Sequence, residues 1–396
     1  MLSVSKQGVF LCGFCAAPSQ IDLMTDEKPP ARISHRLFAT SRSEMEDNMK
    51  KQKNIAVIFG GCSSEYSVSL SSAAAVLKNL DADIYTPVML GITKSGDWFY
   101  YTGSIDAIQN DTWHESGLCT PAVISPNRSR RELLVLDASG ISRIELDAAF
   151  PVLHGKNGED GTVQGIIQAA GIPLVGCGVL SSALCMDKER AHRLVSAAGI
   201  ETAKSLVLNS VSDLRIAYEF CEAVGYPVFV KPVKAGSSYG ITKVHTESAL
   251  EDAICIAFQY DNEVILEENI DGFEVGCAVL GTDELTVGEV DEIELSNGFF
   301  DFTEKYTLKS SKIHVPARIS PEKSSEIKAA AKLIYRTLGC SVFARVDMFL
   351  TPEGKIVFNE VNTIPGFTEH SRYPGMMNAA GYSFKELLTM IIEQGG

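Results

Sequence analysis

The hydrophobic pattern first becomes regular near Asn54, where it predicts a strand, a turn and a helix in succession. Residues 55–59 form a continuous apolar run that predicts a buried strand, and Gly60-Gly61 predicts a turn after it. Ser63-Ser64 then predicts the cap of a helix over residues 65–80. This order is typical of the opening unit of a doubly wound α/β domain.

The rest of the chain continues in short apolar runs separated by glycine, proline and polar clusters, which predicts α/β or α+β architecture throughout. We expect an N-terminal α/β domain over residues 54–180, a central domain over 181–270 and a C-terminal domain over 271–396. The predicted strands cover residues 146–153, 173–176, 228–232, 264–268, 274–280, 345–350 and 358–362, and the predicted helices cover 163–170, 187–198 and 384–393.

Residues 1–53 lack this regular pattern. An apolar run over residues 9–17 is short, and the segment after it mixes proline, serine and charges of both signs. A cleaved targeting segment is the alternative, but Lys6 is the only basic residue before the apolar run, and acidic residues lie between Glu44 and Asp47. We therefore expect an extraneous or disordered leader, with the functional chain starting near Met49.

Composition narrows the class of protein. The 396 residues are 45% hydrophobic and 21% charged, and the net charge of −15 disfavours nucleic-acid binding, which needs a basic face. No segment has the length of a transmembrane helix. The ten cysteines lack the paired spacing of a zinc site or the density of a disulfide scaffold. These features predict a cytoplasmic protein with reduced thiols that acts on small molecules rather than on nucleic acid or membranes.

The most informative pattern lies in the last quarter of the chain. Two alternating apolar strands are joined by a short turn and place Asp347, Glu360 and Asn362 near one end, with Arg345 beside them. Acidic residues on adjacent strands are most often solvated surface residues. Here, however, the oxygen ligands suit a hard divalent cation, and the Pro365-Gly366 loop that follows can present backbone amides to a ligand. This combination favours phosphoryl chemistry.

Nucleotide binding is predicted without a P-loop, which is absent from the sequence. Lys231 ends a predicted strand, and residues 236–240 form a glycine-serine loop whose amides suit a triphosphate. Glu267 and Glu268 close another apolar strand, where they suit the adenine amino group, and Glu274 suits ribose hydroxyls. The alternative interpretation is that the three glutamates are exposed surface carboxylates and that residues 236–240 form an ordinary turn.

Several motifs occur in the order found in the D-alanine:D-alanine ligases and their vancomycin-resistance relatives, which have the ATP-grasp fold. The chain resembles this family from about residue 55 to its C-terminus. The motifs are Gly60-Gly-x-Ser-x-Glu65-x-x-Val-Ser, His154-Gly-x-x-Gly-Glu-Asp-Gly, Met186-Asp-Lys188, Val230-Lys231-Pro with Gly236-Ser-Ser, Glu304-Lys305-Tyr306, and Asn359-Glu360-Val-Asn362-Thr-x-Pro365-Gly366.

The resemblance implies an ATP-dependent carboxylate-amine ligase. ATP phosphorylates the carboxylate of a first D-alanine, and the amine of a second substrate attacks the acyl phosphate to give a dipeptide. The resemblance assigns nucleotide binding to Lys188, Lys231, Ser237, Ser238, Glu267, Glu268, the backbone near Ile270, Glu274 and Lys305. It assigns two magnesium ions, for which manganese is a possible substitute, to Asp347, Glu360 and Asn362, and the oxyanion to Arg345 and the amide of Gly366.

The same resemblance assigns the substrate subsites. Glu65 is the counter-ion of the first D-alanine's ammonium group and is linked through Ser237 to Tyr306. His154 borders this subsite, although a purely structural loop hydrogen bond is an equal alternative. Ser371 binds the carboxylate of the second substrate.

The second substrate is predicted to be D-serine. Residues 299–306 resemble the lid loop that excludes water, and Tyr306 argues against relatives that make a D-alanyl-D-lactate ester. The Phe-Phe-Asp-Phe approach to this tyrosine, and Arg372 where a leucine is common, resemble the G-type vancomycin-resistance D-alanine:D-serine ligases.

The alternatives are a housekeeping D-alanine:D-alanine ligase, another ATP-grasp ligase and a catalytically inactive nucleotide sensor. The resemblance further implies a homodimer.

Overall fold

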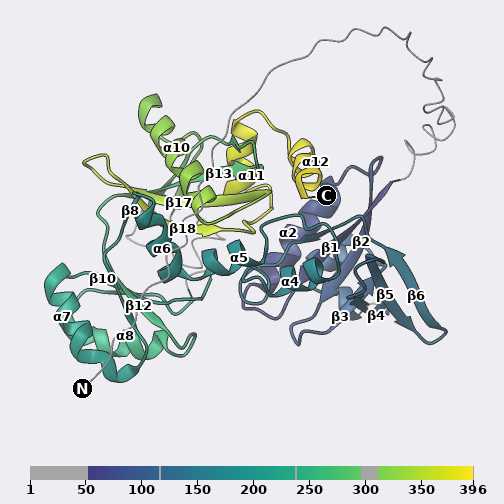
Figure 1. The fold of residues 1–396 in the computed structure, drawn as a ribbon, viewed down its shortest axis with the longest axis horizontal. Coiled ribbons are helices and arrows are strands. Elements are labelled where there is room, and N and C mark those ends of the chain that lie inside the picture. The colour runs from purple at the N-terminus through teal and green to yellow at the C-terminus, as the bar shows by residue number, and fades with distance from the viewer. Residues whose placement is uncertain (1–51, 116, 237–238, 296–310, 396) are drawn as a thin grey trace, which may run out of the picture. The chain divides into compact units, whose positions relative to one another are not determined.

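The structure is a computed structural model that describes residues 52–115, 117–236, 239–295 and 311–395. These residues belong to one compact unit, residues 51–396, which contains three β-sheets with helices around them (Figure 1). The leader is outside the described residues except for its last two positions. The predictions for Ser237, Ser238, Lys305, Tyr306 and the lid segment 299–306 also lie outside them.

The first sheet has the strand order β6-β5-β4-β3-β2-β1-β7. The predicted apolar strand is β1, which is buried from Ile55 onward and runs parallel to β2 and β7. The other neighbouring strands pair antiparallel, and this meander was not predicted. The predicted strand at residues 173–176 is a single bridge between Ala149 and Leu174. The strands are β1 (Lys53–Gly60), β2 (Tyr85–Ile92), β3 (Trp98–Tyr101), β4 (Cys119–Ile124), β5 (Glu132–Asp137), β6 (Gly140–Glu145) and β7 (Ala148–Pro151).

The helices of this part are α2 (Tyr66–Asn79), α3 (Ile105–Gln109), α4 (Thr162–Ala169) and α5 (Val179–Met186). Helix α2 packs on β1 through a mostly apolar face that includes Leu70, Ala73 and Val76. The prediction that Ser63-Ser64 caps this helix is wrong, because Glu65 occupies the N-cap position. Ser63 instead accepts a hydrogen bond from the Glu65 amide at 3.1 Å and so shapes the entry to the helix.

The second sheet is antiparallel and has the order β11-β10-β12-β9. Helices α7 and α8 pack their apolar faces on it, around a core that includes Val228, Val230 and Leu266. Its elements are β9 (Ser205–Leu208), α7 (Leu214–Val224), β10 (Val228–Pro232), β11 (Thr242–Val244), α8 (Leu250–Ala257) and β12 (Val264–Glu268). Helix α6 (Lys188–Ala197) precedes it and is capped by the side chain of Asp187.

The third sheet has the order β16-β15-β13-β17-β18-β8, and β14 pairs with β13. Helix α10, which was not predicted, begins with a Ser320 cap and Pro321 at its first position. The elements are β8 (Glu201–Thr202), β13 (Phe273–Leu280), β14 (Thr286–Val287), β15 (Asp291–Leu295), β16 (Ser311–His314), α10 (Pro321–Thr337), β17 (Phe343–Leu350), β18 (Ile356–Asn362), α11 (Arg372–Ala379) and α12 (Phe384–Gly395). Strand β8 comes from the predicted central segment, so the division at residues 180 and 270 stays a proposal.

Aromatic packing fixes the loop that follows β18. Phe367 is fully buried and lies 5.9 Å from the ring of Phe150 and 5.4 Å from that of Phe343, measured between ring centroids. Tyr373 packs on the same ring at 5.6 Å. Such edge-to-face and tilted contacts add to the burial energy of the rings. The cluster therefore joins β7 of the first sheet to β17 of the third and to α11.

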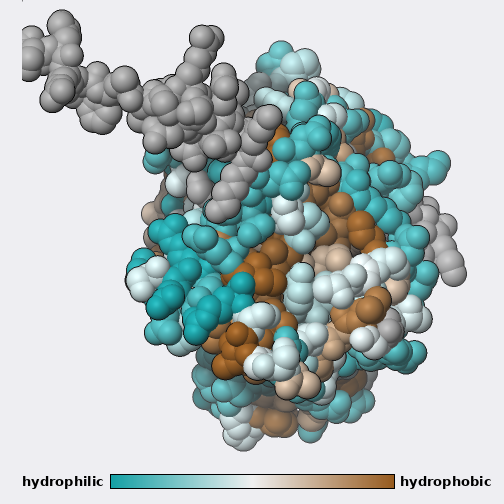
Figure 2. Space-filling model, turned by 90° about the vertical axis from the view of Figure 1, so that its right-hand side faces the viewer, coloured by the Kyte–Doolittle hydropathy of each residue, from teal (hydrophilic) through white to brown (hydrophobic). Residues whose placement is uncertain are grey.

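The described surface carries scattered apolar side chains. Figure 2 shows apolar patches among hydrophilic residues on one face of the molecule. Apolar atoms make up more than half of the surface of ordinary folded proteins, so these patches do not indicate a partner. The eight cysteines in the described part of the chain are free thiols. Among the described helices, none is long and apolar enough to cross a bilayer.

Candidate active site

Strands β17 and β18 bring the predicted magnesium ligands together. In their antiparallel register, Arg345 lies opposite Asn362, and Asp347 lies opposite Glu360. Positions two apart along a strand share a face, so all four side chains belong to the same side of the sheet. A register irregularity follows directly after Asp347. The predicted juxtaposition is confirmed, whereas metal binding itself stays a prediction.

Asp347 is the buried centre of this group, with 1% of its side chain exposed. Arg345 donates from Nε to Oδ1 at 2.8 Å and from Nη2 to Oδ2 at 2.7 Å. Asn362 donates from Nδ2 to Oδ2 at 2.9 Å. No group of three His, Cys, Asp or Glu side chains in the described residues is arranged as a metal site. With Glu360, this set instead offers two carboxylates and an amide, and such oxygen donors fit magnesium.

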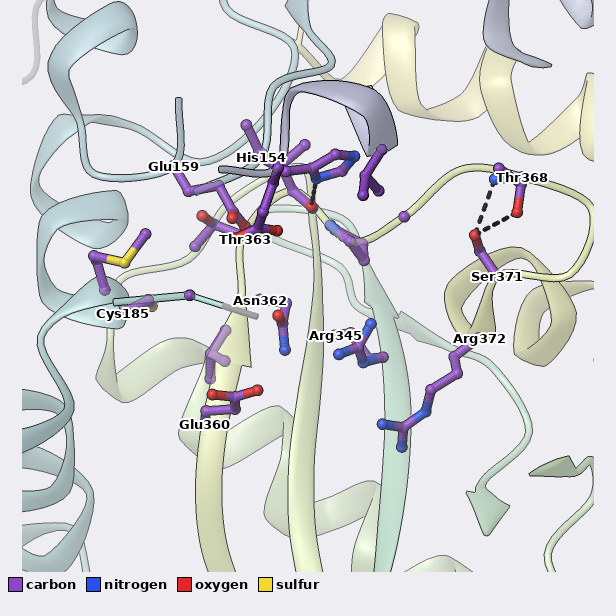
Figure 3. Close-up of a pocket in the computed structure, with 18 of the residues that line it drawn as sticks. His154, Glu159, Cys185, Arg345, Glu360, Asn362, Thr363, Thr368, Ser371 and Arg372 are labelled. Carbon is purple, nitrogen blue, oxygen red and sulfur yellow. Dashed lines mark hydrogen bonds between the residues drawn. The ribbon is translucent and has the colours of Figure 1, made fainter. Parts of the chain in front are cut away.

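A cavity of about 180 Å³ opens beside these side chains (Figure 3). Its walls come from the start of α2, the loop after β7, the α5–α6 segment, β18 and the loop that leads to α11. It therefore collects most of the predicted catalytic and substrate-binding residues in the described part of the chain, together with two predicted metal ligands and one predicted nucleotide-binding lysine. They are Glu65, His154, Lys188, Arg345, Glu360, Asn362, Gly366, Ser371 and Arg372.

Glu65 is buried at the start of α2, where two glycines make room for its carboxylate. A Cβ atom added to Gly155 would lie 2.8 Å from Glu65 Oε1, and one added to Gly236 would lie 2.5 Å from it. Gly155 also has a φ of +73°, which disfavours other residues. Because Gly236 directly precedes Ser237, the carboxylate lies next to the segment to which the resemblance links it.

Glu159 is a candidate that the sequence analysis missed. It is buried in the loop after β7, lines the same cavity and accepts a hydrogen bond from the Gly155 amide at 2.7 Å. Burial, and to a smaller extent the negative charge of Glu65, raises the pKa of Glu159 above its usual range. The available signal was its position in the His154-Gly-x-x-Gly-Glu-Asp-Gly motif. Two carboxyl groups therefore lie near the expected ammonium subsite.

His154 is buried and bonded through both ring nitrogens. Nδ1 lies 3.0 Å from the carbonyl oxygen of Ile364, and Nε2 lies 3.1 Å from Ser72 Oγ. Burial, opposed by the bond to Ile364 and assisted by the positive charge of Arg345, lowers the pKa of His154 to about 4. His154 is therefore neutral at pH 7. His154 borders the cavity, as predicted for a substrate subsite, and it also makes structural hydrogen bonds to a loop, which was the alternative role predicted for it.

We expect this neutral histidine to make the protein less stable as the pH falls from about 6.5 to 4. The unfolded chain binds a proton in that interval and the folded one does not, so the free energy of unfolding falls by about 3 kcal/mol from this group. Urea denaturation across the interval should show a shallower pH dependence for His154→Gln. The matched control, His245→Gln at an exposed position, should keep the wild-type slope, and equal slopes for all three proteins would contradict the assignment.

Ser371 lies at the N-terminus of α11 and faces the loop after β18. Its Oγ accepts a hydrogen bond from the Thr368 amide at 3.0 Å and lies 2.9 Å from Thr368 Oγ1 (Figure 3). A Cβ atom added to Gly366 would lie 2.9 Å from Ser371 Oγ. The predicted oxyanion amide and the predicted carboxylate-binding hydroxyl are therefore close neighbours.

Arg372 points from the start of α11 toward the strands and away from Ser371 (Figure 3). It forms two bonds to Asp291, at 2.7 and 2.8 Å, and Nη1 donates to Glu274 at 2.5 Å. Nη2 also lies 3.4 Å from Asp347 Oδ1. Gly276 leaves space for this guanidinium, because a Cβ atom there would lie 2.3 Å from Nη2. Arg372 thus lines the cavity while its guanidinium is bound by carboxylates.

This arrangement changes the interpretation of two predicted residues. Glu274, predicted to hold ribose, is a partner of Arg372, and Arg372, predicted to favour D-serine, belongs to a buried ion cluster beside Asp347. Asp291 is fully buried and was missed. Strand β15 begins with Asp291-Glu292, and the local sequence does not indicate which of these two carboxylates faces the interior. Ribose and substrate contacts of Glu274 and Arg372 stay predictions.

A second cavity, of about 490 Å³, has the predicted nucleotide residues in its wall. Lys231 Nζ lies 2.5 Å from Glu267 Oε2, and Glu267 is 4% exposed rather than one of three exposed carboxylates. Burial acts to raise the pKa of Glu267, but the positive charge of Lys231 and its hydrogen bond outweigh it, so the pKa lies below its usual range. Lining residues with a predicted nucleotide role are Lys188, Lys231, Glu267, Glu268, Ile270 and Glu274.

Two buried polar atoms in this cavity lack hydrogen-bond partners within the described chain. They are Glu267 Oε1 and His192 Nδ1, which lie 3.9 Å apart. A buried unsatisfied acceptor is rare in native proteins, and an adenine amino group would satisfy this one. Lys188 donates to the carbonyl oxygen of Ala235 at 2.7 Å, which places its ammonium group next to the residue that precedes the glycine-serine segment. The cavity therefore fits ATP.

The comparisons with known proteins agree with this geometry. Residues 54–177 match the family model described as D-ala D-ala ligase N-terminus, and residues 194–393 match that described as D-ala D-ala ligase C-terminus. The vancomycin C-type resistance protein VanC1 of Enterococcus gallinarum is 45% identical over 342 residues, covering 86% of this chain and 97% of that protein.

Further relatives include an enzyme named for a different substrate. A D-alanine--D-alanine ligase of Caldicellulosiruptor bescii is 43% identical over 347 residues, covering 85% of this chain and 93% of that protein. The crystal structure of VanG D-Ala:D-Ser ligase from Enterococcus faecalis superposes with a TM-score of 0.81 at 58% identity, covering 87% of this chain and 100% of that one.

Proposed function

The chain belongs to the D-alanine:D-alanine ligase family, and on that basis we propose that it joins D-alanine to D-serine through a D-alanyl phosphate. It is an ATP-dependent ligase with the ATP-grasp fold. The observation that carries the proposal is one cavity that collects Glu65, Arg345, Ser371 and two of the three proposed metal ligands, Glu360 and Asn362. The product is a modified peptidoglycan precursor that gives vancomycin resistance.

The nucleotide cavity holds ATP through residues that already face it. Lys188 and Lys231 bind phosphates, and Glu267 and the backbone near Ile270 bind adenine, while Glu268 lines the same cavity and accepts from the Lys204 amide at 2.9 Å. Bound ATP supplies the phosphoryl group that activates the D-alanine carboxylate. Asp347, Glu360 and Asn362 would hold magnesium ions, which would spread the charge of that group.

The smaller cavity orients the amino acids. Glu65 holds the ammonium group of the first D-alanine, and Glu159 lines the same cavity. Burial strengthens the attraction between the Glu65 carboxylate and the ammonium group. Arg345 and the Gly366 amide donate to the oxyanion that forms when the second amine attacks. Ser371 holds the carboxylate of that second substrate, beside the Gly366 amide.

D-serine as the second substrate rests on two features. One is the 58% identity to a structure described as a D-Ala:D-Ser ligase. The other is Arg372 where housekeeping ligases commonly have leucine, although its guanidinium is bound by Asp291 and Glu274 and does not point toward Ser371. The housekeeping alternative is favoured by the D-alanine--D-alanine ligases that are about as similar as the resistance proteins. A homodimer and a cytoplasmic location, where ATP is available, belong to the proposal.

A competition assay tests the proposal. Purified protein with ATP, magnesium, D-alanine and an equal concentration of D-serine should give mainly D-alanyl-D-serine, resolved by mass. Mostly D-alanyl-D-alanine would identify a housekeeping ligase instead. Both substrates must compete in the same assay, because a pocket that merely tolerates a hydroxyl discriminates only about 100-fold between them. ADP release that does not depend on D-alanine would indicate a nucleotide sensor.

A further inference from the structure

Ser72 on α2 makes hydrogen bonds that a helical serine does not ordinarily make. Serine within a helix often bonds the carbonyl oxygen four residues earlier, and Ser71 does so with Ser67 O at 3.2 Å. Ser72 is fully buried and instead contacts His154 and Phe367, which are 82 and 295 residues away in the sequence. Its hydroxyl therefore connects two segments of the candidate active site.

The donors and acceptors can be assigned in the series of hydrogen bonds that runs from Phe367 through Ser72 and His154 to Ile364. The Phe367 amide can only donate, so Ser72 Oγ accepts from it at 3.3 Å. The Ile364 carbonyl can only accept, so His154 Nδ1 carries a proton and donates to it at 3.0 Å. Because His154 is neutral and carries its proton on Nδ1, its Nε2 can only accept, and Ser72 donates to it at 3.1 Å. Two backbone groups and one hydroxyl thus select a single neutral tautomer of His154.

The hydrogen bonds hold both ends of a four-residue loop. Ile364 is held through its carbonyl oxygen and Phe367 through its amide, and only Pro365 and Gly366 lie between them. The ring of Phe367 is fully buried, so this end of the loop is also held by packing. The position of the Gly366 amide therefore depends on Ser72 and His154, which belong to the N-terminal part of the chain.

We propose that Ser72 is a positioning residue, which places the Gly366 amide for the oxyanion and keeps His154 in its Nδ1-protonated form. The proposal rests on the proposed ligase function, in which that amide is a donor. Ser72 does not touch the substrate and acts through the loop. Removing its hydroxyl leaves the Phe367 amide and His154 Nε2 without their partner, and the loop can then relax.

A matched pair of variants separates positioning from simple loss of a buried hydroxyl. Ser72→Ala is the test, and Ser69→Ala is the control, because Ser69 is equally buried on the same helix but, within the part of the chain that the structure describes, bonds the Gly60 amide and the Val152 carbonyl rather than His154 or Phe367. We expect Ser72→Ala to lower kcat for ADP formation with D-alanine between about 10- and 100-fold, since small misplacements of catalytic groups have effects of this size.

Two further measurements complete the test: the KM for ATP, compared with kcat, and the ¹⁵N spectrum of His154. The KM for ATP should stay within about twofold in both variants, because the nucleotide cavity is lined by other residues. In ¹⁵N-histidine spectra of the full chain, with His154 assigned through His154→Gln, wild type should show a protonated Nδ1. Ser72→Ala should shift both nitrogens, and Ser69→Ala should not.

Either of two results would overturn the proposal. These are unchanged His154 nitrogens in Ser72→Ala, or shifted nitrogens with kcat no lower than in Ser69→Ala. If Ser72→Ala does not fold, Ser72→Cys, which keeps the volume but donates weakly, is held to the same criteria. A wild-type protein that forms no ADP with D-alanine would refute the ligase function and the positioning role with it. The histidine spectra would then decide the hydrogen-bond arrangement separately.

Discussion

Replacing Arg345 with methionine is expected to lower kcat between about 100- and 1,000-fold, as the loss of one preorganised oxyanion donor does in other enzymes. Arg345 contacts both carboxylate oxygens of Asp347, so the variant also leaves this buried carboxylate with less positive charge around it. The measurement is initial-rate ADP formation at saturating ATP and D-alanine over a magnesium titration. Restoration of activity by excess magnesium would assign Arg345 to metal-site assembly instead of the oxyanion.

Two further variants make this result interpretable. Arg345→Lys keeps the charge but not the two-pronged geometry, so we expect it to remain impaired, because the ammonium group cannot bond both oxygens. Arg215→Met removes an exposed arginine of α7 whose ion-pair partner is Glu219, four residues further along the same helix. It should retain wild-type turnover. Equal rates for Arg345→Met and wild type would refute the catalytic role.

Replacing Arg372 with leucine is expected to lower the free energy of unfolding by about 3–5 kcal/mol, which is the usual cost of removing one partner from a buried ion pair. Asp291 is 0% exposed and would keep its charge without the guanidinium that now bonds both of its oxygens. Glu274 would lose the hydrogen bond and charge that Arg372 supplies. Urea denaturation of the wild type and the variant measures the change.

The double variant Arg372→Leu, Asp291→Leu provides the thermodynamic control. It removes the buried charge together with its partner, so its destabilisation should be smaller than the sum of the two single changes. Arg193→Leu, at a guanidinium that is 81% exposed, should have little effect. If Arg372→Leu is as stable as the wild type, the ion cluster does not stabilise the fold, and a role in substrate choice becomes the better account of Arg372.

The local sequence pattern predicted the site where its residues lie close together in the chain. Arg345, Asp347, Glu360 and Asn362 lie on two strands joined by a short turn, and period-2 alternation suffices to place them on one face. The N-terminal strand and helix were predicted for a similar reason. Their apolar run and following turn are continuous in the sequence, although the capping residue was assigned to the wrong position.

Long-range contacts were not predictable in this way. The ion cluster joins Arg372 on α11 to Glu274 on β13 and Asp291 on β15, and no local pattern states which of many carboxylates a buried arginine will meet. The antiparallel strands added to the first sheet are a similar case, because short half-buried strands have weak patterns.

The sequence by itself thus determined the family, the ATP-dependent chemistry and the grouping of Arg345, Asp347, Glu360 and Asn362 on one face of two strands, because ordered motifs and strand alternation are local features. Only the tertiary structure decided that Arg372 is bound by carboxylates, that Glu159 lies beside Glu65, and that Ser72 and His154 hold the loop of Gly366. The physical reason is that burial and hydrogen-bond direction depend on segments as much as 295 residues apart in the chain, which meet only when the sheets pack.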